Sequence, residues 1–247
     1  MVKRSSKVSA ILTEQGKVRG VATQDGRFYQ SCNVVIASAV RTALEHWLDS
    51  PDLIPDRYSR KIAMMEATGS YYVAYYSVCA EAVEGLWPNI EIRNNNKAIS
   101  ELWSPDAYYI LIPSLVDSTA APPGSHCLCL SVPCPVGYYI LGKEGQRHCR
   151  TFLESSVEKH FPQLKGKMTF LFELAPEHLA SISGNPAGSA YGWAQTPEQS
   201  GIKRLNLKTP IPGLYLAGHW TMPGGGIAGV VTSGQLCAQT ILARNLQ

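Results

Sequence analysis

The sequence lacks the features that define several classes of protein. It has no apolar run close to the roughly 20 residues of a membrane-spanning helix, and residues 1–17 have no apolar centre of the kind found in signal peptides. Its 21 Gly and 16 Pro residues follow no three-residue period, which excludes a collagen-like rod. Only 17% of residues are charged and the formal net charge is +3, so neither disorder nor nucleic-acid binding is indicated. Hydrophobic residues, at 45% of the chain, suffice for the core of one large domain or two smaller ones.

The densest group of basic residues is Lys3, Arg4 and Lys7, close to the amino terminus. A solvated chain end is the simpler interpretation, and weak contact with an anionic membrane surface is the alternative. We therefore expect a cytoplasmic protein, either free or peripheral on a membrane, with no nucleic-acid partner.

The seven cysteines are an odd number spread over a long chain, which favours reduced thiols over a secreted disulfide framework. No pair has the C-x2-C spacing with which two thiolates hold one zinc ion, so we expect no metal site. Residues 127–132, which include two of the cysteines, are instead typical of a buried strand in which Cys acts as a small apolar side chain.

The first part of the chain contains signals for hairpins and then for a buried strand. Gln15-Gly16 and Asp25-Gly26 each separate two β-rich runs, and glycine tolerates the positive φ that tight hairpin turns require. The continuous apolar run 34–37 predicts a strand buried on both faces, as in a parallel sheet. Residues 41–48 predict a short helix.

Residues 64–136 consist of alternating β stretches joined by turns, which is typical of an antiparallel sheet. A helix is predicted over 143–160, because apolar residues recur there at helical spacing and Pro162 follows. Four tyrosines place rings on both faces of the strand predicted over 71–78, where they either line an apolar pocket or simply pack. These four are Tyr71, Tyr72, Tyr75 and Tyr76. The region predicts a separate domain built from a sheet and a helix.

The most informative stretch is 211–236. A short buried strand is predicted over 214–217, and it leads through a glycine-rich loop into a helix that begins near Ile227. Such a unit directs free backbone N–H groups and the positive end of a helix dipole at one point beyond the strand. An anion or an electron-rich carbonyl would be stabilised there.

Gly224, Gly226 and Gly229 match the expression G-x-G-x-x-G. The full dinucleotide fingerprint also needs a following strand and an acidic residue about 20 positions further on, which this sequence does not provide. Two interpretations of the glycines therefore stay open, namely a cofactor loop and a tight packing turn between helix and strand.

The string GLYLAGHWTMPGGGI at 213–227 resembles the carboxyl-terminal flavin motif of the phytoene desaturase and carotenoid isomerase family, which belongs to the FAD-dependent, amine-oxidase-like oxidoreductases. Residues 16–21 and 34–39 resemble the hairpin and the returning strand of that family. Residues 184–192 resemble a landmark of its substrate domain. The resemblance covers almost all 247 residues.

The resemblance implies an α/β plus α+β fold. A partial FAD-binding, Rossmann-like domain would comprise 1–42 and 203–247, and an inserted antiparallel-sheet substrate domain would comprise 43–202. The family's first βαβ unit, which holds the FAD pyrophosphate, has no counterpart before Lys7. The resemblance is thus to a carboxyl-terminal portion, which would supply the ribityl and isoalloxazine side of the site and the substrate cavity.

The resemblance also implies ten cofactor-binding residues in three groups. Along the flavin would lie Gly218, His219, Trp220 and Thr221; near the pyrimidine end of its ring, Gly224, Gly225, Gly226 and Ile227; and beside the cofactor, Ala37 and Ser38. His219 stands where many flavoproteins of the wider group have an acidic residue, and a histidine can still form one hydrogen bond there. The sequence identifies no catalytic acid or base.

The activity implied by the resemblance is FAD-dependent desaturation or isomerisation of a long apolar polyene, such as a carotenoid precursor. The first alternative is a non-catalytic fragment or half-enzyme that needs a partner chain, carrying the missing pyrophosphate-binding unit, to bind FAD. The second alternative is a flavin amine oxidase with a polar substrate, since the wider group shares the carboxyl-terminal motif.

Overall fold

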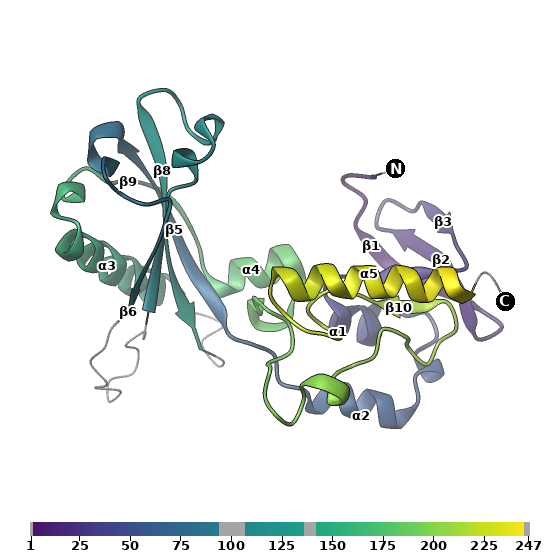
Figure 1. The fold of residues 1–247 in the computed structure, drawn as a ribbon. Helices are drawn as coiled ribbons and strands as arrows, with labels where there is room; N and C mark the ends of the chain where they lie inside the picture. Colours follow the sequence, from purple (N-terminus) through teal and green to yellow (C-terminus); the bar gives the residue numbers. More distant parts are fainter. Residues whose placement is uncertain (1, 94–106, 136–141, 245–247) are drawn as a thin grey trace. The chain divides into compact units, whose positions relative to one another are not determined.

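The computed structural model describes residues 2–93, 107–135 and 142–244, which form two compact units (Figure 1). Unit 1 comprises residues 1–68 and 180–247, and unit 2 comprises residues 69–179. The domain junctions expected at 42/43 and 202/203 therefore both fall inside unit 1. The reason is that residues 43–68 and 180–202 pack together: Ile62 and Met65 share one buried cluster with Trp193, and Ala67 bridges to Trp193.

Unit 1 is a mixed α/β unit with one three-stranded antiparallel sheet and one two-stranded parallel sheet. Its strands are β1 (Val8–Glu14), β2 (Lys17–Thr23), β3 (Phe28–Gln30), β4 (Val34–Ile36) and β10 (Leu214–Leu216). Its α-helices are α1 (Val40–Thr42), α2 (Asp56–Met64) and α5 (Ile227–Arg244), and α4 (Pro176–Ser183) crosses the junction with unit 2. A π-helical turn spans Ala43–Trp47, and 3₁₀ turns span Pro51–Leu53, Pro186–Gly188 and Gly201–Lys203.

The hairpin prediction at the start of the chain is confirmed. β1 pairs with β2 across Gln15 and Gly16, whose φ values of 50° and 75° are both positive, as a tight two-residue hairpin turn requires. Gly26, at φ 80°, lies in the turn before β3. The predicted helix over 41–48 is replaced by the short α1 and the π-helical turn.

β4 and β10 form the parallel pair that the apolar run 34–37 predicted. The expectation that this run is buried on both faces is wrong for Val35, which remains 42% exposed, and for Ala37, which is also exposed. The strand lines a hollow of about 350 Å³ together with Val8, Val21 and Trp47.

Unit 2 is a five-stranded antiparallel sheet with strand order β6-β7-β8-β5-β9. The strands are β5 (Ser70–Cys79), β6 (Asn89–Arg93), β7 (Ala107–Leu111), β8 (Ser125–Cys134) and β9 (Thr169–Leu174), and the long helix is α3 (Gly142–His160). Short 3₁₀ turns span Ala80–Val83, Pro113–Leu115, Ser118–Ala120 and Pro162–Leu164. The antiparallel sheet, the long helix and the strand over 127–132 are confirmed.

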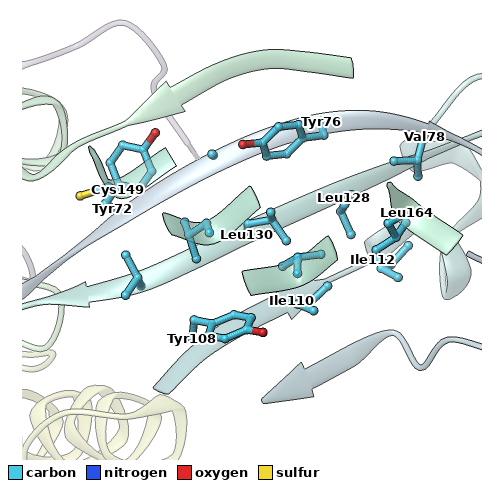
Figure 2. Close-up of a cluster of buried hydrophobic side chains, with 14 of the residues drawn as sticks. Tyr72, Tyr76, Val78, Tyr108, Ile110, Ile112, Leu128, Leu130, Cys149 and Leu164 are labelled. Carbon is cyan, nitrogen blue, oxygen red and sulfur yellow. The ribbon is translucent and has the colours of Figure 1, made fainter. Parts of the chain in front are cut away.

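The core of unit 2 lies between one face of the sheet and α3. Alternate residues of β5 are buried, and Tyr72, Tyr76 and Val78 gather there with side chains of β7 and β8 (Figure 2). Tyr76 donates a hydrogen bond to Glu154 of α3 at 3.0 Å. The other two tyrosines of the strand, Tyr71 and Tyr75, alternate onto the opposite face, where they are partly exposed.

All seven cysteines are free thiols. Burial raises the pKa of Cys129 and of Cys134 to about 11, and that of Cys149 to about 12, so these three are buried thiols that stay protonated at neutral pH. The described residues contain no group of three or more His, Cys, Asp or Glu side chains placed to hold a metal ion. Among the described helices, none combines the length and the apolar character needed to span a bilayer.

Candidate functional site

The carboxyl ends of β4 and β10 lie side by side because the two strands are parallel and in register, with Ile36 opposite Leu216. The backbone N–H of Ala217 donates to the Ile36 carbonyl at 2.9 Å, which carries the pairing one residue beyond the strand. At Gly218, with φ 85°, a Cβ atom would lie 2.8 Å from the Ala37 carbonyl oxygen. Glycine is therefore required at the point where the two chain segments touch.

The glycine-rich loop that follows β10 is fastened to α5. The backbone N–H of Gly218 donates to the hydroxyl of Ser233, a fully buried residue of α5, at 3.0 Å. Gly229 packs so closely on the loop that a Cβ there would lie 2.7 Å from the Gly224 carbonyl oxygen. The third glycine of G-x-G-x-x-G thus has a packing role, which is one of the two interpretations that the sequence left open.

The remaining loop glycines differ in what surrounds them. A Cβ at Gly225 would lie 3.1 Å from the Tyr191 carbonyl oxygen, and one at Gly224 would contact the Gln195 amide at 3.3 Å. Gly226, with φ 86°, has no atom within 4 Å of its Cβ position, and the next residue, Ile227, is 85% exposed. The loop therefore has one packed side and one open side, and the open side lies at the start of α5.

The first turn of α5 offers unpaired donors at that open side. An α-helix leaves its first N–H groups without intrahelical acceptors, and Val230, bonded to the Gly226 carbonyl at 3.0 Å, is the first N–H of this helix to find one. No hydrogen bond among the described residues uses the N–H of Ile227 or Ala228. The helix dipole adds partial positive charge at the same place.

A buried arginine holds the loop from beneath. Arg204 is only 2% exposed, and its guanidinium donates to the carbonyl oxygens of His219 at 2.6 Å, Trp193 at 2.9 Å and Thr221 at 3.0 Å. Burial lowers the pKa of Arg204 from its ordinary value, although arginine stays charged at any physiological pH. The charge is thus stabilised by carbonyl dipoles, and in return it fixes the path of the loop. Nothing in the sequence around Arg204 indicated this role.

His219 is half-buried next to this arginine. Burial, and secondly the charge of Arg204, lower its pKa below the ordinary 6.5. The imidazole is therefore neutral at pH 7 and has one donor and one acceptor nitrogen. The backbone of His219 is also close-packed against segment 184–192, because a Cβ at Gly192 would lie 2.6 Å from the His219 carbonyl oxygen.

Two of the residues assigned to the flavin by resemblance have side chains inside the core. Trp220 is fully buried and meets Trp193 edge-to-face, with ring centroids 4.7 Å apart. Thr221 is fully buried as well, and its hydroxyl donates to the Leu205 carbonyl at 2.7 Å. Both side chains are therefore directed into the packed interior of unit 1.

Ala37 and Ser38 are exposed beyond the end of β4. Their path is set by Asn185, a buried residue whose amide oxygen accepts from the Ala39 N–H at 3.2 Å and whose amide nitrogen donates to the Ser189 carbonyl at 3.0 Å. Ala39 itself has φ 49°. The segment 184–192 therefore belongs to unit 1 and contacts this site, whereas the resemblance placed it in the substrate domain, with residues from Gly188 onward running back toward the flavin. The turn signal Gly184-Asn185-Pro186 was visible, but its distant contact with Ala39 was not.

The lowered pKa of His219 predicts how stability depends on pH. Because the unfolded chain binds a proton at this histidine more readily than the folded chain, the free energy of unfolding should fall as the pH drops below 6.5. We expect His219→Gln to remove part of that loss, whereas His46→Gln, a change at an exposed position, should leave it intact. Urea titrations above and below pH 6.5 measure the difference. Equal pH dependence in His219→Gln and the parent chain would contradict it.

Comparison with known proteins identifies the family to which this site belongs. The family model described as flavin containing amine oxidoreductase matches residues 2–242. The chain belongs to that family. Two relatives match it along almost its whole length. One is a zeta-carotene-forming phytoene desaturase of Myxococcus xanthus, 25% identical over 95% of this chain and 47% of the relative. The other is a chloroplastic prolycopene isomerase of Arabidopsis thaliana, 24% identical over 98% of this chain and 42% of the relative. The resemblance stated from the sequence is confirmed.

This flavin amine oxidoreductase chain spans about half the length of the curated relatives that it matches. Among solved structures it is similar to an oxidoreductase from Methanosarcina mazei, with a TM-score of 0.56 and 16% identity over 94% of this chain and 48% of that one. At this identity the likeness concerns the fold alone. This likeness of fold agrees with the mixed α/β architecture of the chain, which contains antiparallel sheets.

Unit 2 offers a second feature, an aromatic face on the side of its sheet away from α3. Four residues of adjacent strands form one row across the sheet, because Leu111 pairs with Cys129, Cys129 with Tyr75, and Tyr75 with Phe172. The rings of Tyr75 and Phe172 are stacked at 4.5 Å, and Phe172 is 50% exposed. Tyr71 and Tyr109 extend the face with a ring contact at 6.3 Å. The face is a partly exposed wall of aromatic rings and apolar side chains.

Proposed function

We propose that unit 1 holds the isoalloxazine and ribityl side of FAD at the carboxyl ends of β4 and β10, in an oxidoreductase that desaturates or isomerises a long apolar polyene. The proposal rests on one observation above all, the open side of the glycine-rich loop with unpaired N–H groups at the start of α5. In this proposal β4, β10 and α5 are part of a Rossmann-like FAD domain.

The residues present fit a flavin ring at this place. The Cβ position of Gly226 opens into free space, and the N–H groups of Ile227 and Ala228 are available to a carbonyl or an anionic ring edge. When bound, the flavin would supply the acceptor for a hydride. Donors at the start of α5 would stabilise the negative charge that the ring gains, which favours its reduction.

The ten predicted residues then divide into two roles. Exposed or half-exposed positions would border the cofactor: Ala37, Ser38, Gly218, His219, Gly225, Gly226 and Ile227. The buried positions Gly224, Trp220 and Thr221 would act as positioning residues, because they pack against Gln195, Trp193 and Leu205. Neutral His219 would give one hydrogen bond where an acidic residue would bring a charge.

The aromatic face of unit 2 supports an apolar substrate. Stacked rings such as Tyr75 and Phe172 bind flat conjugated chains through dispersion and exclude water from them. Burial raises the pKa of Tyr75, so its hydroxyl is neutral and adds no charge to the wall. The two relatives named above have carotenoids in their names, which agrees with this substrate class.

A second candidate is a half-enzyme that needs a partner chain for FAD binding. One observation favours it: the hollow beside β4 and the exposed apolar residues Val35, Ile227 and Val231 leave part of unit 1 uncovered. A partner carrying a pyrophosphate-binding βαβ unit would cover such a surface. In that case the residues described above would still provide the ring side of the shared site.

The deciding experiment is to titrate the purified 247-residue chain with FAD and, separately, with riboflavin, following flavin fluorescence and the visible spectrum. Riboflavin is the matched probe, because it has the ring and the ribityl chain but no pyrophosphate. If the chain holds only the ring side, both should bind saturably, with similar Kd values and a perturbed spectrum. A folded chain that binds neither contradicts the first proposal and favours the half-enzyme.

A further inference from the structure

A basic groove on unit 1 is lined by none of the residues assigned to the flavin. Its volume is about 540 Å³, within the roughly 300–1,000 Å³ of small-molecule sites. Four lining residues are cationic, namely Arg57, Arg60, Lys61 and Lys203, and one is acidic, Glu198. The lining of the groove is therefore net positive.

The walls of the groove are held in fixed positions. One wall is the stripe of α2 that carries Arg57, Arg60, Lys61 and Met64 at helical spacing. Gln199 joins this wall to the other: its amide nitrogen donates to the carbonyls of Glu66 and Ala194, each at 2.8 Å, and its amide oxygen accepts from the Glu66 N–H at 3.0 Å. The groove is therefore formed before any ligand arrives.

Among the lining residues only Glu198 offsets the cations, and it interacts electrostatically with Lys203 without forming a close ion pair. None of the ion pairs in the described part of the chain involves Arg57, Arg60, Lys61 or Lys203. Both ammonium groups are steadied by backbone carbonyls: Lys61 donates to Arg204 at 3.3 Å and Lys203 to Pro197 at 3.0 Å. Arg57 and Lys61, four residues apart on α2, repel each other, which disfavours the helix unless an anion lies between them.

Apolar side chains accompany this positive charge. Met64 lines the groove and is 83% exposed, while Ile202, next to Lys203, is 93% exposed. Free inorganic phosphate has no apolar part that could contact exposed apolar groups beside its cationic ligands. A ligand with an anionic head and an apolar tail would contact both.

We propose that this groove binds the phosphate group of an acidic amphiphile, with the phosphate between α2 and Lys203 and the apolar part against Met64 and Ile202. Guanidinium groups such as those of Arg57 and Arg60 bind phosphate oxygens with two parallel hydrogen bonds each. The amphiphile is either an acidic phospholipid within a membrane or a dispersed phosphate ester. The groove and the set of residues assigned to the flavin have no residue in common.

The test measures sedimentation of the full chain with vesicles of phosphatidylcholine, with and without phosphatidylglycerol, and titration with monomeric short-chain phosphatidic acid. We expect binding to the acidic vesicles and not to pure phosphatidylcholine. Since each basic residue near an anionic surface contributes about fivefold, Arg57→Glu with Arg60→Glu should weaken binding by at least about tenfold. Met64→Ser should weaken it too. Lys61 is left unchanged, because its ammonium also bonds Arg204.

The matched control is Lys165→Glu with Lys167→Glu in unit 2, which changes the net charge equally. It should shift binding by less than about twofold, and all variants should keep the parent's circular dichroism and thermal midpoint. Binding to vesicles alone identifies the membrane as the source of the ligand, and binding to the short-chain ester alone identifies a dispersed ester. Equal losses in both double variants, binding of neither ligand, or binding of inorganic phosphate unaffected by Met64→Ser would overturn the proposal.

Discussion

Gly226→Ala is expected to weaken flavin binding by about 10- to 100-fold, because the new methyl group would project into the space assigned to the ring, where overpacking costs about 1–3 kcal/mol. The position itself has room for a Cβ, since no atom beyond its two neighbours in the chain lies within 4 Å of it. The effect on affinity therefore reports on the ligand. Fluorescence titration with FAD and riboflavin measures it, in the chain alone or with a partner that completes the site.

The matched control for this experiment is Gly26→Ala. Gly26 has nearly the same φ, 80° against 86°, and its Cβ position is equally open, but it lies in a hairpin turn of unit 1. Both substitutions should cost about 1–2 kcal/mol of stability, because an L-residue is strained at positive φ. Only Gly226→Ala should change flavin affinity. If the two variants bind flavin equally well, the ring does not lie against Gly226.

Arg204→Met is expected to lower the free energy of unfolding by about 2–4 kcal/mol. The substitution leaves the buried carbonyls of Trp193, His219 and Thr221 without their donor, and each unpaired group costs about 1–3 kcal/mol. Relief from burying a charge offsets part of that cost. The glycine-rich loop would also lose its fixed path. We therefore expect the loss of free energy of flavin binding to exceed the loss of free energy of unfolding. Chemical denaturation and the flavin titration measure the two effects.

The control for Arg204→Met is Lys208→Met, which removes the same charge from an exposed position and should change stability by less than about 0.5 kcal/mol. Arg204→Lys should give an intermediate loss, because an ammonium keeps the charge but does not reach all three carbonyls at once. A stable Arg204→Met variant with unchanged flavin affinity would show that the loop does not depend on this side chain.

Sequence reasoning was most successful where structure depends on neighbouring residues. The hairpin at Gln15-Gly16 follows from the φ values that the turn needs, and the antiparallel sheet and α3 follow from apolar periodicity. The continuous apolar runs indicated two buried strands, the first of parallel-sheet type, and the structure pairs them as β4 and β10. The exposure of Val35 was not indicated, because an apolar run does not say whether a second layer covers it.

The domain junctions and the supports of the site depended on contacts between distant parts of the chain. The structure divides at 68/69 and 179/180, since Gln199 and Trp193 bind the segment after α2. Asn185 and Ala39 are 146 residues apart, and no periodicity links them. The basic groove likewise joins α2 to Lys203, which are far apart in sequence.

The sequence by itself therefore determined the unit of strand, glycine-rich loop and helix at 214–244, and with it the family. Those features are encoded by glycine's conformational freedom and by local apolar spacing. Only the tertiary structure decided that Gly229 packs while Gly226 stays open, and that Trp220 and Thr221 face the core. It also decided that Arg204 holds the loop, because the three carbonyls that it binds come together only when segments 193–204 and 219–221 have folded against each other.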